Sequence, residues 1–170
     1  MKQTNFLLEF TDAFREQFGS EYRWDGGQAF ENTASLVTHI SRRRSVGVRK
    51  AERFELGDIT TNFLGWKIIV EFESKELPLS NILKYWPYIR GELSITPEYP
   101  ILLCHFSDWW SYATRRDLWE WTLSRMQADP AKLFDIKGQQ FDHGGNDTDL
   151  RIQSIETAIK WIGDIVHFVN

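Results

Sequence analysis

Two glutamates, Glu71 and Glu73, stand at the end of an apolar run in the segment KIIVEFES, residues 67–74. Residues two apart on a β-strand point to the same face, so both carboxylates should project together. Lys67 and Ile69 share that face, which places the acids where the face passes from buried to open. Two neighbouring carboxylates repel each other unless a cation or a shared proton compensates them. Because hard oxygen ligands suit Mg²⁺, the pair predicts a divalent-metal site.

Asp58 is a third acid that a simple fold would bring to this pair. Twelve residues separate it from Glu71, and the segment NFLG between them indicates a turn. In an antiparallel hairpin, Asp58 and Glu71 would lie on adjacent strands, within reach of a common ion. The alternative is that the two glutamates are ordinary surface charges of a strand.

The elements that must position these acids follow from the spacing of apolar residues. Helical spacing predicts helices over residues 4–18, 28–41, 77–93, 112–129 and 150–169. Alternating or continuous apolar runs predict two or three strands within 51–74, and further strands at 99–107 and 131–137. Loops are expected at 23–28 and 139–149, and Pro87 should kink or end its helix. The chain is therefore expected to be an α/β protein.

Length, charge and cysteine content narrow the class of protein. The 170 residues predict a single domain over 1–170, and the net charge of −4 excludes a strongly basic DNA-coating protein but allows a local basic groove. The lone Cys104 forms no intramolecular disulfide and no cysteine zinc site, so a cytoplasmic location is expected. Glu9 and Asp12 interrupt the N-terminal apolar residues. Neither a signal peptide nor contact with a membrane is expected.

The residues Asp58, IIVEFES and the following helical segment SNILKYWPYI resemble the motif of the PD-(D/E)xK nuclease superfamily. The resemblance covers about residues 27–107. It implies a restriction endonuclease-like fold, in which a mixed β-sheet core is flanked by helices. It also implies hydrolysis of phosphodiester bonds of DNA with Mg²⁺, or Mn²⁺, as cofactor. RNA as the substrate remains open.

The resemblance assigns roles to individual residues. Asp58 and Glu71 would be the metal ligands, and Phe72 would be the spacer. Glu73 stands where the superfamily usually has the lysine that orients or activates the attacking water. It would act as a base or as a ligand of a second Mg²⁺.

Three further residues complete the expected site. Lys75, on the same strand face, or Lys84, on the following helix, would replace the missing lysine. The superfamily includes members whose lysine has moved onto this helix. Lys84 is the preferred candidate, because a helix packed on the sheet can aim a long side chain at the strand end. Glu31, expected on the helix before the hairpin, would add a metal ligand.

A basic segment just before the hairpin is a candidate for binding nucleic acid. It contains Arg42, Arg43, Arg44, Arg49 and Lys50. Phosphate contacts by such residues strengthen binding through counterion release. A solvated helix end explains the same residues equally well.

Two other patterns favour structural interpretations. The segment FDIKG offers Asp135 and Lys137 as a second acid–lysine pair, but no acid lies at a suitable distance before it. The tryptophan-rich segment 107–121 predicts core packing or a homodimer surface rather than base stacking. The leading hypothesis is therefore a metal-dependent nuclease. The alternatives are an inactive nuclease-fold protein that serves as a binding or assembly module, and an α/β interaction protein.

Overall fold

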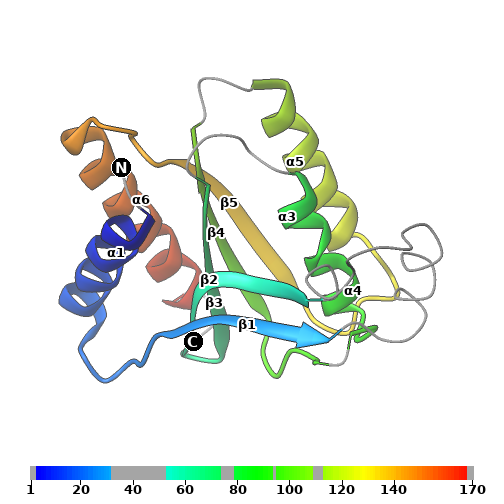
Figure 1. Cartoon of the computed structure of the whole chain (residues 1–170). Helices are drawn as coiled ribbons and strands as arrows, with labels where there is room; N and C mark the ends of the chain where they lie inside the picture. Colours follow the sequence, from blue (N-terminus) through cyan, green and yellow to red (C-terminus); the bar gives the residue numbers. More distant parts are fainter. Residues whose placement is uncertain (1–2, 32–52, 74–78, 94, 109–112, 168–170) are drawn as a thin grey trace.

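The residues that the structure describes form a mixed α/β fold, in which a five-stranded sheet is flanked by helices. Figure 1 shows the computed structural model, which describes residues 3–31, 53–73, 79–93, 95–108 and 113–167. The strands lie in the order β1-β2-β3-β4-β5. Their bounds are β1 Asp25–Glu31, β2 Arg53–Phe63, β3 Trp66–Phe72, β4 Ile101–Ser107 and β5 Ile136–Asp142. β1, β2 and β3 pair antiparallel, whereas β3, β4 and β5 pair parallel.

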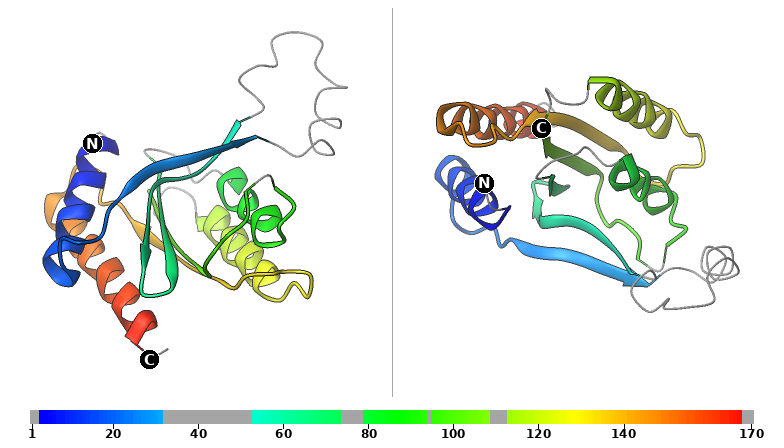
Figure 2. Two further views of the ribbon diagram at one scale, coloured as in Figure 1. Left: turned by 90° about the horizontal axis from the view of Figure 1, so that it is seen from below. Right: turned by 45° about the horizontal axis from the view of Figure 1, so that its top comes forward.

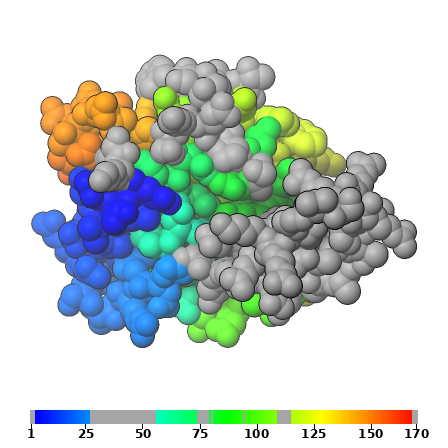
Figure 3. All heavy atoms as spheres, in the orientation of Figure 1, coloured from blue at the N-terminus to red at the C-terminus, as the bar shows by residue number. Residues whose placement is uncertain are grey.

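Helices cover both faces of the sheet (Figures 1 and 2). α1 (Gln3–Phe18) and α6 (Thr148–His167) pack side by side on one face. The short helices α3 (Leu79–Leu83) and α4 (Tyr85–Ile89) lie on the other face with α5 (Ala113–Gln127). In the space-filling view, α1 in blue and the start of α6 in orange form one edge of the molecule (Figure 3). None of the described helices is long and apolar enough to cross a membrane.

Several local predictions are confirmed. The β2–β3 hairpin turns at Leu64 and Gly65, whose φ angles of 46° and 79° are both positive, as a tight two-residue hairpin turn requires. α1 ends before Gly19, which has φ 103°. The helical segment that contains Pro87 is broken at Lys84, between α3 and α4. The proline ring has no N–H to donate and collides with the carbonyl four residues earlier, which explains the break.

The helix predicted over 28–41 is wrong for its first four residues. Residues 28–31 belong to β1, which pairs with β2 from Asp25↔Thr60 to Glu31↔Arg53. The rest of that segment lies outside the described residues. Pairing with a neighbouring strand has prevailed over the helical spacing of apolar residues. The loop predicted at 23–28 is wrong for residues 25–28 for the same reason, since β1 begins at Asp25.

The last strand is also displaced from its predicted position. Residues 131–135 are not in a strand, and β5 instead runs from Ile136 to Asp142. It aligns along its whole length with β4, from Ile101↔Ile136 to Ser107↔Asp142. The predicted loop at 139–149 therefore begins only after Asp142.

Candidate active site

The hairpin places Asp58 beside the end of β3. Ile59 pairs with Val70 across the two strands, and the Phe72 N–H donates to Asp58 Oδ2 at 2.7 Å. The Gly57 N–H donates to Glu71 Oε1 at 3.0 Å. The prediction that Asp58 and Glu71 lie on adjacent antiparallel strands is therefore confirmed.

Gly57 makes this close approach possible. Its φ of +71° is in the region that favours glycine, and a Cβ atom there would lie 2.5 Å from Ile69 Cγ2. A larger residue would push β2 away from β3 and remove the N–H donor from Glu71. A glycine inside a strand often marks such an approach, so the sequence did contain this signal.

Glu71 is held by three donors at one carboxylate oxygen. Its side chain is 4% exposed, and Lys84 Nζ lies 2.5 Å from Oε1. The Tyr85 hydroxyl and the Gly57 N–H donate to the same oxygen. Burial raises the pKa of Glu71, while the Lys84 charge opposes that rise. Burial and the nearby Glu71 charge raise the pKa of Tyr85, so its hydroxyl remains a proton donor.

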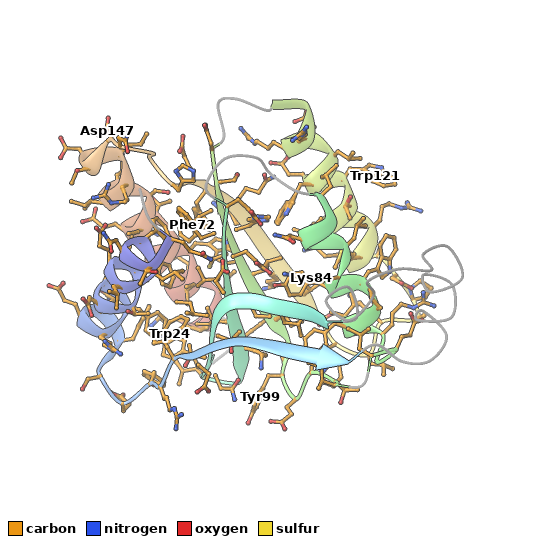
Figure 4. All side chains as sticks on the ribbon, in the orientation of Figure 1. Trp24, Phe72, Lys84, Tyr99, Trp121 and Asp147 are labelled. Carbon is orange, nitrogen blue, oxygen red and sulfur yellow. The ribbon has the colours of Figure 1, made fainter. Side chains whose placement is uncertain are left out.

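Lys84 reaches Glu71 from the break between α3 and α4. Figure 4 shows Lys84 on the α3–α4 side of the sheet and Phe72 on the α1 side. The Lys84 side chain is 10% exposed, so the ion pair with Glu71 is buried. Of the two lysines expected to replace the motif lysine, Lys84 thus lies at the site, and Lys75 is outside the described residues.

Glu73 continues the acidic face toward solvent. Its Oε1 accepts a hydrogen bond from Asn81 Nδ2 of α3, and its side chain is 18% exposed. Burial, followed by the charges of Glu71 and Asp58, raises the pKa of Glu73 to about 7. The three acids are therefore close enough to influence one another, as the sequence predicted.

His105 lies next to Glu71 on the neighbouring strand. The parallel register pairs these two residues, and His105 is fully buried. Trp119 Nε1 donates to His105 Nδ1 at 2.8 Å, and His105 Nε2 lies 3.9 Å from Glu73 Oε1. Burial and the Lys84 charge lower the pKa of His105 to about 3. Cys104 packs in the core on the opposite face, as expected for adjacent residues of a strand.

Glu31 does not lie where it was predicted. It ends strand β1 and pairs with Arg53, five positions before Asp58 on β2. The expected position on a helix before the hairpin is therefore wrong.

The basic segment cannot be placed against the site, because Arg42, Arg43, Arg44, Arg49 and Lys50 are outside the described residues. Asp135 and Lys137 make other contacts. Asp135 pairs with Lys132 at 2.8 Å, and Lys137 Nζ lies 5.3 Å from the centroid of the Trp66 ring. These contacts agree with the structural interpretation of the second acid–lysine pair.

The carboxylates fit a metal site with two protein ligands better than one with three. Among the described residues, no group of three or more His, Cys, Asp or Glu side chains could hold a metal ion. Mg²⁺ is often bound through one or two carboxylates, with waters and substrate phosphates completing its coordination. Asp58 and Glu71 could supply that number, and Glu73, with a side chain 18% exposed, is the third carboxylate nearby.

A large groove lies elsewhere on the molecule. It has a volume of about 860 Å³ and is lined by α1 and α6. Several of its charged residues are paired within the protein, including Glu9 with Arg151 at 2.6 Å and Lys160 with Asp164 at 2.5 Å. Gly57, the buried ion pair of Glu71 with Lys84 and the carboxyl groups of raised pKa all lie on the other side of the sheet, so the candidate active site is placed there.

Sequence reasoning missed five residues that shape the site. They are Gly57, Asn81, Tyr85, His105 and Trp119. Apart from the glycine within a strand, these residues had no distinctive spacing, because their roles depend on contacts between separate elements. The chain matches no known protein family, no curated protein and no solved structure.

Proposed function

We propose that the protein is a Mg²⁺-dependent nuclease of the PD-(D/E)xK type that hydrolyses phosphodiester bonds of DNA. The observation that carries this proposal is the meeting of Asp58, Glu71 and Lys84 at the end of β3. The fold adds support. The described residues form a mixed sheet flanked by helices, as the resemblance implies, and the helix before its three antiparallel strands is α1, which precedes the residues 27–107 that the resemblance covers.

Each residue has a role that its surroundings allow. Asp58 and Glu71 would hold Mg²⁺, which polarises the phosphoryl oxygen and lowers the pKa of bound water. Gly57 and Tyr85 fix the orientation of Glu71 through their hydrogen bonds to Oε1. The Lys84 ammonium group, which lies 2.5 Å from Glu71 Oε1, would stabilise negative charge that develops on the phosphate.

Glu73 is the candidate general base. A base is most effective when its pKa lies near the working pH, and the pKa of Glu73 is raised to about 7. Its carboxylate would accept the proton of the attacking water. Glu73 thus performs part of the work for which the superfamily usually employs a lysine.

Cleavage of nucleic acid tests this proposal. The protein should nick or cut supercoiled plasmid DNA with Mg²⁺ or Mn²⁺, and not with EDTA. Asp58→Asn should lose at least 100-fold in rate and keep its fold, because the amide oxygen can still accept from the Phe72 N–H. Glu71→Ala should abolish both metal binding and cleavage. Glu156→Gln, an exposed change on α6, is the matched control and should cleave like the original protein.

Single-stranded RNA incubated under the same conditions decides between DNA and RNA. Failure to cleave either substrate with any divalent ion, or full activity of Asp58→Asn, would overturn the proposal. A light-scattering mass would show whether the chain forms the homodimer typical of a restriction-like cutter.

The same fold without activity, acting as a binding or assembly module, is the second candidate. The donors already gathered at Glu71 Oε1 favour it, since Lys84 compensates the carboxylate without a metal ion. Calorimetric titration with Mg²⁺ separates the two. The nuclease proposal requires that the original protein binds Mg²⁺ and that Glu71→Ala does not. The binding-module hypothesis requires no Mg²⁺ binding.

A further inference from the structure

A row of buried polar side chains crosses the sheet beneath α5. The strand register aligns Glu71 of β3, His105 of β4 and Gln140 of β5. His105 is fully buried, and Gln140 is 4% exposed. His105 Nε2 and Gln140 Oε1 have no hydrogen-bond partner within the described part of the chain. Buried polar atoms without partners destabilise a fold, so an unpaired atom beside a candidate active site requires an explanation.

The hydrogen bond from Trp119 determines which nitrogen of His105 carries the proton. An indole N–H can only donate, and it lies 2.8 Å from His105 Nδ1. Nδ1 must therefore be the unprotonated acceptor, and the single ring proton of the neutral imidazole is on Nε2. His105 thus presents a fixed, neutral N–H donor.

This donor faces Glu73. The 3.9 Å between His105 Nε2 and Glu73 Oε1 is too long for a direct hydrogen bond. An oxygen atom about 2.8 Å from each of them would complete a triangle with good hydrogen-bond lengths on both sides. A water molecule suits this position, because its oxygen can accept from Nε2–H while one of its protons is donated to Glu73.

We propose that His105 is a catalytic residue that binds the attacking water together with Glu73, and that Trp119 positions it. The inference rests on the proposed function. As the water oxygen forms its bond to phosphorus, its proton passes to Glu73 Oε1. The bond from phosphorus to the leaving oxygen breaks, and its electron pair stays on that oxygen. His105 keeps its own proton throughout.

Two substitutions of His105 separate this role from a structural one. His105→Asn places its amide near the position of Nδ1 and should lower kcat at least tenfold, with KM for DNA unchanged. His105→Gln extends its amide to about the position of Nε2 and should recover most of kcat. Cys104→Ala is the matched control. It changes an equally buried residue of the same strand that faces the opposite core, and it should leave kcat unchanged.

Trp119→Phe tests the positioning step. It removes the donor to Nδ1, so the imidazole proton is no longer restricted to Nε2. We expect kcat to fall about threefold to fivefold. Nitrogen NMR of the ring should show a protonated Nε2 and a bare Nδ1 in the original protein, and a mixture of tautomers in Trp119→Phe. A protonated Nδ1 in the original protein would overturn the inference. This spectrum is recorded on the original protein, so the test does not depend on whether a His105 variant folds.

A readout independent of cleavage distinguishes failure of this inference from failure of the nuclease proposal. The side-chain carboxyl carbon of Glu73, assigned through Glu73→Gln, should shift in His105→Asn and return in His105→Gln. If DNA is cleaved but the Asn and Gln variants behave alike, the inference is wrong and the nuclease proposal stands. If nothing is cleaved, the nuclease proposal fails. If, in addition, the NMR signal of the Glu73 carboxyl carbon is the same in His105→Asn and His105→Gln as in the original protein, the proposed contact between Glu73 and His105 is rejected as well.

Discussion

The two faces of the central sheet differ most at the ends of the same strands. Toward α1 and α6, the strands remain apolar to their last residues, where Phe6 contacts Phe72 and Phe106 at ring distances of 4.7 and 4.6 Å. Toward α3 and α5, the face begins with buried Ile69 and Leu103. Two residues further along each strand it changes to Glu71 and His105.

The two faces therefore contribute differently: one face mainly stabilises the fold, and the other carries the side chains that could do chemistry. The face toward α1 buries aromatic rings against one another, and such packing contributes much of the stability of a small domain. The face toward α5 buries a carboxylate, an ammonium group and an imidazole, which require costly and specific compensation. A fold optimised only for stability would place apolar residues on both faces, so the polar face indicates a function.

The largest effect on stability is expected on the aromatic face. Phe106 is fully buried and contacts the rings of Phe6, Phe10 and Phe141. Phe106→Ala should lower the free energy of unfolding by about 4 kcal/mol, measured by urea denaturation, because it removes this packing and leaves a cavity. Leu8→Ala, at a side chain 57% exposed, is the control. A loss below about 1 kcal/mol for Phe106→Ala would show that the aromatic face is not the main source of stability.

Breaking the buried ion pair should have a slightly smaller effect. Glu71→Leu leaves the Lys84 ammonium group buried without its counter-charge and should cost about 3 kcal/mol. The double variant Glu71→Leu with Lys84→Met should regain most of that loss, because it removes the charge as well. Thermal unfolding of the original protein, the two single variants Glu71→Leu and Lys84→Met, and the double variant completes this double-mutant cycle. If the losses of the two single variants simply add in the double variant, the pair is not coupled.

The pH dependence of stability should reveal Glu73. Its pKa rises from 4.5 in the unfolded chain to about 7 in the fold, so the folded state binds the proton more tightly. The contribution to stability is complete below pH 4.5 and is lost as the pH rises through 7. Each pKa unit corresponds to about 1.4 kcal/mol, so after allowance for partial exposure the fall should be roughly 2 kcal/mol. Glu73→Gln should remove this fall, and the same slope in both proteins would contradict the shift.

The smallest effect is expected for a pair on the surface. Lys160 and Asp164 are one helical turn apart on α6, with side chains 75% and 53% exposed. Lys160→Ala should change the free energy of unfolding by less than about 0.5 kcal/mol, because water screens the pair. If Lys160→Ala lowers the free energy of unfolding as much as Glu71→Leu does, exposed and buried ion pairs do not differ in their contribution to stability, and the comparison between them fails.

The sequence predicted α1, α5, α6 and the central hairpin because their signals are local. The phenylalanines of α1, the turn at Leu64 and the break before Pro87 each depend on a few neighbouring residues. β1 was missed because its identity depends on β2, more than twenty residues away in the sequence. β5 was displaced because its register is set by β4.

In the candidate site, too, contacts between neighbouring segments were predictable from the sequence, and contacts between distant segments were not. The meeting of Asp58 and Glu71 was predictable, since one hairpin joins them. The contact of Lys84 with Glu71 was favoured through the resemblance, and because a helix packed on the sheet can aim a long side chain at the strand end. The hydrogen bond between Trp119 and His105 joins a helix to a strand, and no sequence spacing indicates which face of that helix meets the sheet.

The central claim is that Asp58 and Glu71 meet where a hard divalent ion can bind. Its most direct test is a crystal soaked in Mn²⁺ at millimolar concentration, with anomalous scattering used to locate the ion. We predict a peak in contact with both the Asp58 and Glu71 carboxylates. Density that shows no ion there, with Lys84 still paired to Glu71, would contradict the claim.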